Sequence, residues 1–263
     1  MDLGLSGQVA LITGATRGIG RAIAECLAEE GCAVGLVARD REELERAAAV
    51  LAERGVRVHA VAADVTDAGA LAAAVDEIAE ALGGLRLLVA NAGGAAGGPL
   101  LEETEAEDWQ TTMALNVTHP ATLLRAALPH LRRNDPPARG AVVLIASISG
   151  QRPQPRSQYA AAKAAEIHLA ATWARELGPD GVRVNAVSPG SILFEGGSWA
   201  ARRDADPEAF AEWVRREFPH GRLGGPDEVA NVAAFLLSER ASWVSGANVV
   251  VDGAQNQPGI AGY

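Results

Sequence analysis

The sequence has 263 residues, 48% of them hydrophobic and 21% charged, and its formal net charge is −10. An acidic chain is not attracted to nucleic acid or to an anionic membrane surface, so we expect neither as a partner. Two cysteines are too few for a disulfide framework, and no histidine or cysteine spacing predicts a metal site. The sequence has neither a run of eighteen apolar residues nor an N-terminal signal-peptide pattern, which predicts a cytoplasmic protein.

Short apolar runs alternate with longer helical patterns from one end of the chain to the other. The runs are rich in valine, leucine and isoleucine without alternating polar residues, as expected for strands buried on both faces of a parallel sheet. They cover residues 8–13, 33–38, 56–61, 85–90, 141–146, 182–187 and 248–251. Between them, helical spacing of apolar residues marks segments such as 19–30, 41–54 and 68–82. This order predicts one α/β domain over residues 1–263, a doubly wound sheet of seven parallel strands with helices on both faces.

The first predicted strand leads into a glycine-rich turn, T-G-A-T-R-G-I-G-R-A at residues 13–22. Gly14, Gly18 and Gly20 stand between a strand and a helix, where glycine permits a tight turn and lets the backbone approach a pyrophosphate. The helix N-terminus adds free N–H groups and the positive end of its dipole. The spacing is G-x-x-x-G-x-G rather than G-x-G-x-x-G, but its place at the first strand–helix turn predicts a phosphate site for a dinucleotide.

Further short motifs follow in chain order. They are A-A-D-V-T with Asp64, N-A-G at residues 91–93, A-L-N-V with Asn116, Y-A-A-A-K at residues 159–163, and P-G at residues 189–190. Together with T-G-x-x-x-G-x-G they resemble the short-chain dehydrogenase/reductase family over essentially the whole chain. The similarity is to its compact single-domain members, such as the 3-oxoacyl-carrier-protein reductases. The resemblance implies a Rossmann fold that binds a nicotinamide cofactor.

Lys163 is the only lysine in the sequence, because 22 of the 23 basic residues are arginine. Tyr159 precedes it by four residues, so the two side chains share a face of the predicted helix. A nearby ammonium favours the charged form of a phenol, and proton transfer is most effective when the phenol titrates near the working pH. The planar fork of arginine differs from a compact ammonium in geometry and hydrogen bonding. The alternative is a pair on a solvated helix face, and we favour the catalytic interpretation.

The resemblance implies roles for the neighbours of this pair. In the strand-end sequence A-S-I-S-G, Ser147 takes the position of the serine that hydrogen-bonds the substrate oxygen. Ser149 is interpreted as a turn residue. Asn116 is implied to hold a water that links Lys163 to solvent as a proton relay, and Lys163 to bond the nicotinamide ribose. The implied catalytic residues are therefore Asn116, Ser147, Tyr159 and Lys163.

The second predicted strand ends in V-A-R-D, residues 37–40. An acidic residue at this strand end holds a free ribose 2′-hydroxyl, whereas arginine suits a 2′-phosphate. By the resemblance Ala38 takes the acidic position and Arg39 follows it, and Arg17 lies at the same corner. Two arginines there favour NADP(H). NAD(H) remains possible, because Asp40 is able to bond a bare ribose.

The resemblance extends the cofactor site along the ends of the strands. It implies that Asp64 bonds the adenine amino group and that Val65 lies beside the ring. The full set implied to contact the cofactor is Gly14, Thr16, Arg17, Gly18, Ile19, Gly20, Arg39, Asp64, Val65, Asn91, Ala92, Gly93, Tyr159, Lys163, Pro189, Gly190 and Ile192.

The segment after P-G, at about residues 191–225, is implied to be a lid over the substrate. Phe194 stands where many family members have a threonine that contacts the nicotinamide carboxamide, so we do not assign it that contact. Apolar residues at helical spacing in this segment, Phe210, Trp213, Val214 and Phe218, either pack as core or wall an apolar pocket. The residues assigned to the substrate are Ser147, Tyr159, Phe194, Trp199 and Trp213. The lid arginines either attract a carrier protein or coenzyme A phosphate or form a solvated face; they are Arg202, Arg203, Arg215 and Arg216.

These observations predict an NADP(H)-dependent oxidoreductase that transfers a hydride between nicotinamide and a carbonyl or secondary alcohol, with a 3-oxoacyl thioester as one candidate. The enzymatic alternatives are an NAD-dependent secondary alcohol or sugar dehydrogenase and an epimerase that recycles the same cofactor. The alternative outside enzymology is a non-catalytic dinucleotide sensor, but such proteins tend to lose the tyrosine or the lysine. The family also implies a homotetramer, with residues 105–131 and 156–177 at one interface and residues 243–254 at another.

Overall fold

Seven parallel strands form one sheet in the computed structural model, which describes residues 2–136 and 139–255. The strand order is β3-β2-β1-β4-β5-β6-β7, so the chain winds outward to β3, returns to the centre at β4 and continues to β7. The strands are β1 (Val9–Thr13), β2 (Ala33–Ala38), β3 (Val58–Ala62), β4 (Leu87–Ala90), β5 (Gly140–Ile145), β6 (Val182–Pro189) and β7 (Asn248–Val251). The predicted fold class is confirmed.

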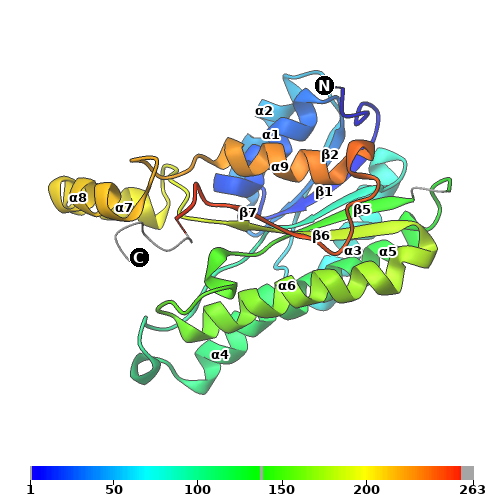
Figure 1. The fold of residues 1–263 in the computed structure, drawn as a ribbon. Helices are drawn as coiled ribbons and strands as arrows, with labels where there is room; N and C mark the ends of the chain where they lie inside the picture. The colour runs from blue at the N-terminus through cyan, green and yellow to red at the C-terminus, as the bar shows by residue number, and fades with distance from the viewer. Residues whose placement is uncertain (1, 137–138, 256–263) are drawn as a thin grey trace.

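Helices cover both faces of the sheet (Figure 1). One face carries α1 (Gly18–Glu29), α2 (Arg41–Ala52) and α9 (Pro226–Leu237). The other face carries α3 (Ala68–Leu82), α5 (His119–Leu131) and α6 (Ser157–Leu177), and α4 (Ala106–Met113) packs against α6. Single 3₁₀ turns occur at Leu101–Glu103, Ile148–Gly150, Gly178–Asp180 and Glu239–Ala241. No helix in the described part of the chain has the length and hydrophobicity needed to cross a membrane.

Each central strand is mostly apolar because its two faces are buried in two different cores. On β1, Ala10 and Ile12 pack in the core under α1, α2 and α9, whereas Leu11 packs in the core under α3, α5 and α6. All five residues of β1 are buried. This double burial explains why the strands read as unbroken apolar runs rather than as alternating patterns.

The long helical segment predicted over residues 105–131 is interrupted in its middle. α4 and α5 are joined by a π-helical turn at Ala114–Thr118, which contains Asn116. Single π turns inside α-helices occur frequently at functional sites, and this one places Asn116 against the end of β4. Among the strands, the third and the fourth begin two residues later than predicted, at Val58 rather than residue 56 and at Leu87 rather than residue 85.

Two helices project beyond the sheet at the end where β6 finishes (Figure 1). They are α7 (Ser198–Ala205) and α8 (Pro207–Glu217), and both fall in the segment predicted as a lid. Phe210, Val214 and Phe218 form a small core of their own with Leu223. We call α7 and α8 the arm.

Candidate active site

The glycine turn between β1 and α1 needs glycine for two different physical reasons. Gly14 and Gly18 have φ of +66° and +55°, in the left-handed region that side chains rarely adopt. Gly20 lies within α1, and a Cβ there would be 2.3 Å from both Gly14 O and Asn91 Nδ2. The turn is therefore a tight backbone cradle in which no side chain fits at these three positions.

The N-terminus of α1 is open toward the cradle. Arg17 is the N-cap residue in extended conformation, and among the described residues no side chain caps the helix. Its first N–H groups are therefore unsatisfied by side chains, and with the helix dipole they form a site for an anion. The cradle and the helix end together fit the pyrophosphate of a dinucleotide.

The N-A-G motif after β4 locks the cradle in place. Asn91 donates from Nδ2 to Thr13 O at 2.9 Å and to Gly14 O at 3.1 Å. In return, Thr13 Oγ1 accepts from the backbone N–H groups of Asn91 and Ala92. Because β1 and β4 are adjacent, these bonds fix the point at which the strand order reverses, where α/β sheets bind their ligands.

Gly93 allows two catalytic candidates to meet. A Cβ at this position would lie 2.8 Å from Asn116 Oδ1 and 3.2 Å from Lys163 Nζ. Asn116 is fully buried, donates from Nδ2 to Gly94 O and Thr112 O at 2.7 Å, and accepts from Gly94 N. Its amide is therefore held rigidly beside Lys163.

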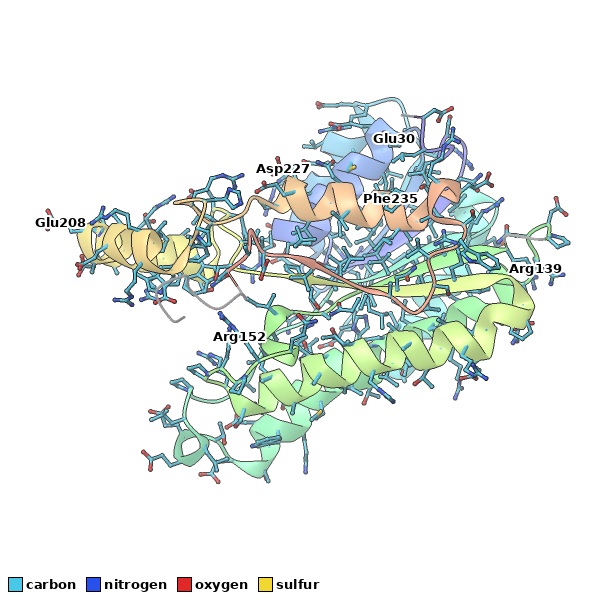
Figure 2. The ribbon with its side chains drawn as sticks, viewed as in Figure 1. Glu30, Arg139, Arg152, Glu208, Asp227 and Phe235 are labelled. Carbon is cyan, nitrogen blue, oxygen red and sulfur yellow. The ribbon has the colours of Figure 1, made fainter. Side chains whose placement is uncertain are left out.

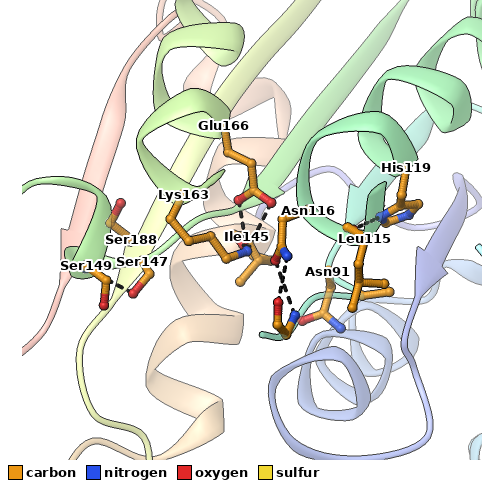
Figure 3. Close-up of polar contacts among 12 residues, drawn as sticks. Asn91, Leu115, Asn116, His119, Ile145, Ser147, Ser149, Lys163, Glu166 and Ser188 are labelled. Carbon is orange, nitrogen blue, oxygen red and sulfur yellow. Dashed lines mark hydrogen bonds and ion pairs between the residues drawn. The ribbon is translucent and has the colours of Figure 1, made fainter. Parts of the chain in front are cut away.

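Lys163 is held by three acceptor atoms inside the protein (Figure 3). Its Nζ donates to Ile145 O at 2.8 Å and lies 3.0 Å from both carboxylate oxygens of Glu166. Nζ also lies 5.5 Å from the centre of the Tyr159 ring. The predicted pairing of Tyr159 with Lys163 on one helix face is thus present, and Glu166 joins it.

The side chains of Lys163 and Glu166 are each 3% exposed. Burial and the charge of the partner shift the pKa of each group in opposite directions. Burial raises the pKa of Glu166 to about 7, although the Lys163 ammonium opposes this shift. Burial acts most strongly, to lower the pKa of Lys163, but the charges of Glu166 and Tyr159 and the hydrogen bond to Glu166 together outweigh it, and the net direction is upward. Lys163 therefore holds its proton firmly.

Ser147 lies in the turn after β5, whose backbone packs closely against the backbone of α6. It follows β5, is buried, and its Oγ accepts from Ser149 N at 3.1 Å. In the turn that follows, a Cβ on Gly150 would lie 2.6 Å from the backbone of Lys163 and Ala164. Glycine at residue 150 thus lets the Ser147 turn pack directly on α6. Ser149 bonds Gln154, in keeping with a turn role.

The end of β2 carries the groups expected to distinguish the two nicotinamide cofactors. Arg39 and Arg17 are exposed. Asp40 is the N-cap of α2, and its side chain accepts from Glu43 N at 2.9 Å. Hydrogen bonds from Thr66 lower the pKa of Asp64, and the charge of Arg39 contributes to the same shift. Asp40 is thus occupied as a helix cap, whereas both arginines are exposed.

The predicted substrate residues fall into two groups. The Phe194 ring lies against the glycine turn, since a Cβ on Gly18 would be 2.9 Å from Phe194 Cζ. Trp199 and Trp213 instead stack on each other in the arm with ring centres 4.8 Å apart, and Arg202 lies 4.4 Å from the Trp213 ring. Phe194 is thus adjacent to the cofactor cradle, and the tryptophans pack with the arm.

The P-G motif is fixed by the last described residues of the chain. A Cβ on Gly190 would be 2.7 Å from Asp252 Cβ, and Ser191 N donates to Gln255 Oε1 at 2.9 Å. Ile192 is buried and pairs with Gly224 across the base of the lid segment. The chain around Tyr263 lies outside the described residues.

Two residues at this site escaped the sequence analysis. Glu166 lies within the quoted helix but was not singled out, although an acidic residue three positions after a buried lysine is a recognisable signal. His119, the first residue of α5, is buried, and burial lowers its pKa to about 4. Within residues 2–136 and 139–255, no group of three or more histidine, cysteine or acidic side chains is placed to hold a metal ion.

The fold and the site together define an oxidoreductase of the dinucleotide-binding α/β type, and comparison with known proteins gives its family. Residues 14–255 match the family model described as Enoyl-(Acyl carrier protein) reductase. The isoepoxydon dehydrogenase of Penicillium expansum is 37% identical over 96% of each chain. The chain belongs to the short-chain dehydrogenase/reductase family, as the motifs suggested.

Solved structures agree in fold and in cofactor type. The L-sorbose reductase of Gluconobacter frateurii, complexed with NADPH and L-sorbose, superposes with a TM-score of 0.90 at 36% identity, covering 98% of this chain and 100% of that one. A 7α-hydroxysteroid dehydrogenase complexed with NADH and 7-oxo glycochenodeoxycholic acid gives 0.87 at 32% identity, covering 96% and 95%. The protein is therefore an oxidoreductase that uses a nicotinamide dinucleotide on alcohols or carbonyls.

Proposed function

We propose that the protein is an NADP(H)-dependent carbonyl reductase or alcohol dehydrogenase in which Tyr159 transfers the proton. The observation that carries this proposal is the convergence of Tyr159, Lys163 and Asn116 at the end of the strands, beside a backbone cradle that fits a pyrophosphate. Bound NADP(H) supplies the hydride for reduction and accepts it in oxidation.

The chain's own residues then have distinct roles. Tyr159 donates a proton to the substrate oxygen in reduction and accepts one in oxidation. Lys163 stabilises the tyrosinate by its charge and bonds the nicotinamide ribose. Ser147 hydrogen-bonds the substrate oxygen, and Asn116 holds a relay water beside Lys163.

The preference for NADP(H) rests on the corner beyond β2. Arg39 directly follows β2 and Arg17 lies in the glycine turn; both are exposed, and a guanidinium binds phosphate in bidentate fashion. Asp40, the residue that would favour a bare ribose, already caps α2 through Glu43 N. The 2′-phosphate thus finds two cations, whereas one oxygen of Asp40, Oδ1, is engaged as the helix cap.

For the substrate we propose a small carbonyl compound held between Ser147, Tyr159 and the lid at about residues 191–225. The lid is the arm together with its two connections to the sheet. Its aromatic residues offer an apolar wall, and Arg202 lies against that wall over the Trp213 ring. A sugar ketone, a steroid ketone and a 3-oxoacyl thioester are the substrate classes to test.

We also propose a homotetramer that uses the long helices around residues 105–131 and 156–177 and the segment 243–254. Large apolar side chains support the second interface, since Trp243 is 99% exposed and Val250 is 37% exposed. Phe235 lies on the outer side of α9 (Figure 2) and is 38% exposed. A sedimentation mass equal to one 27.1 kDa chain would contradict this assembly.

The test is turnover followed by nicotinamide absorbance, with NADPH and then NADH, over L-sorbose, a 7-oxo steroid and a 3-oxoacyl thioester. Tyr159→Phe should reduce turnover by roughly 10²- to 10⁴-fold and leave NADPH binding intact, because only the proton donor is lost. Thr172→Val, which also removes one hydroxyl but at an exposed position on α6, is the control and should leave turnover unchanged. Binding of both cofactors without turnover of any carbonyl would favour the sensor alternative instead.

A further inference from the structure

We propose that Glu166 is a positioning residue for proton transfer. Its buried carboxylate holds the Lys163 ammonium at the end of β5, and its negative charge opposes ionisation of Tyr159. This inference rests on the proposed roles of Tyr159 and Lys163, but it concerns a residue to which neither the family motif nor the comparisons assign a role. We call the Lys163–Glu166 contact the buried ion pair.

The geometry of the buried ion pair fixes the position of Nζ. Nζ lies 2.8 Å from Ile145 O and 3.0 Å from both Glu166 oxygens. One N–H directed at the carbonyl and one shared by the carboxylate oxygens hold the ammonium on two sides, which leaves the third N–H for the nicotinamide ribose. Ile145 is the last residue of β5, two positions before Ser147. Lys163 therefore bonds the strand end that carries the proposed substrate-binding serine, and Glu166 holds the same ammonium from α6 (Figure 3).

The energetics require a counter-charge at this position. An unpaired ammonium in so buried a place is strongly destabilised, and removal of one partner of a buried pair leaves the other charge uncompensated. Glu166 supplies the compensation from within α6, before any cofactor is bound. The lysine therefore stays charged and in place in the free protein.

The carboxylate also acts on Tyr159 with a definite sign. A negative charge nearby makes every neighbouring acid release its proton at a higher pH, and the effect is larger where water is excluded. Lys163 favours the tyrosinate, and Glu166 moderates that effect.

Few other charges reach the buried ion pair. His119 at the start of α5 is close enough for the charge of Lys163 to act on it. It is neutral at neutral pH, because burial lowers its pKa to about 4. β5 adds Ile145 O and apolar side chains. On β6, Arg183 is directed to backbone carbonyls of residues 236–238 and 244. On α4, Glu107 is exposed and the Asp108 side chain bonds the backbone of residue 105.

The composition of this chain makes a direct test possible without turnover. Tyrosine occurs twice and lysine once. In a Tyr263→Phe background, the near-ultraviolet absorbance of tyrosinate reports Tyr159 alone. Adding Glu166→Gln, which removes the charge and keeps the shape, should move the titration midpoint of Tyr159 downward by about one pH unit.

Two variants serve as controls in the same background. Glu166→Asp keeps the charge and should leave the midpoint closer to that of the parent than Glu166→Gln does. Glu176→Gln makes the same chemical change at an exposed position further along α6 and should not move the midpoint. An unchanged midpoint in Glu166→Gln, or an equal shift in Glu176→Gln, would overturn the proposal.

A second measurement needs no substitution and covers the case in which Glu166→Gln fails to fold. Protein labelled with isotopic lysine gives one side-chain resonance in nuclear magnetic resonance, because Lys163 is the single lysine. That resonance should be that of a charged, immobile side chain in the free protein, because the buried ion pair holds the ammonium. A mobile or uncharged lysine side chain in the free protein would overturn the proposal. Both readouts are independent of turnover, so failure of the reductase assignment and failure of this inference are distinguishable.

Discussion

The glycine turn and the arm lie at the same end of the sheet but are built on different principles. The turn consists of backbone atoms: glycines at positive φ, an open helix end and an asparagine that bonds two main-chain carbonyls. The arm consists of side chains that pack on one another in a small core apart from the two cores of the sheet. The turn therefore tolerates little change in sequence, whereas the arm is free to change its surface.

This contrast has a functional consequence. A pyrophosphate is the same in every dinucleotide, so a rigid backbone site suits it. Substrates differ between relatives, and a separate unit of side chains is able to vary without disturbing the sheet. Under the proposed function, the cofactor end is thus the rigid part of the site and the arm is the part that is able to vary.

The largest expected effect is that of Gly20→Ala in the turn. The new Cβ would lie 2.3 Å from Gly14 O and Asn91 Nδ2, and the carbonyl is backbone that has no free rotation. We expect a loss of about 3 kcal/mol in the free energy of unfolding and loss of NADPH binding, because the cradle must shift. Denaturant unfolding and cofactor titration measure these quantities.

The control for this substitution is Gly178→Ala. Gly178 has a φ of −54°, and nothing lies within 4 Å of its Cβ position. It should therefore accept alanine without loss. If the two variants lost stability equally, the rigidity of the turn would not be the cause.

The next effect is acid destabilisation through His119. Burial lowers the pKa of His119 from 6.5 to about 4, so the unfolded chain binds a proton that the folded protein accepts only at lower pH. This stability is fully present above pH 6.5 and is lost as the pH falls through about 4. It amounts to at most about 3 kcal/mol. Between these two pH values, the free energy of unfolding should fall less steeply with decreasing pH in His119→Gln than in the wild type. An equal slope in both proteins would refute the linkage. His168→Gln, at an exposed site on α6, should keep the wild-type slope.

A smaller effect is expected from Arg39→Ala at the outer edge of the cofactor site. Loss of a charge-assisted bond to the 2′-phosphate should weaken NADPH binding by about tenfold and leave NADH binding nearly unchanged. Fluorescence titration with each cofactor measures the difference. Arg41→Ala, the neighbouring exposed arginine at the start of α2, should alter neither affinity. An equal loss of affinity for both cofactors would show that Arg39 does not distinguish them by the 2′-phosphate.

The smallest effect on global stability is expected in the arm. Trp213→Ala removes the stacking with Trp199 and the edge contact with Phe218. Because the arm has its own core, global unfolding should change by less than about 1 kcal/mol, while hydrogen exchange within residues 198–217 rises. Leu88→Ala, in the buried β4, should instead cost about 2–5 kcal/mol. A similar global loss in both variants would contradict the independence of the arm.

The sequence alone determined the sheet, the turn and the members of the proposed proton-transfer pair. Buried parallel strands read as apolar runs because both faces meet a core. Gly14 and Gly18 were recognisable from their spacing, because a turn with positive φ at these positions excludes most residues other than glycine. Tyr159 and Lys163 were recognisable because one helical turn separates them and the chain has no other lysine.

Only the tertiary structure decided the surroundings of these residues. The partner of Lys163 depends on the burial of Glu166, and burial results from the packing of α6 on β5 rather than from local spacing. The π turn at Asn116 and the use of Asp40 as a cap arise from contacts that propensity does not encode. Local rules fix the backbone, whereas the charge state and partners of a side chain are set by segments that meet only in the folded chain.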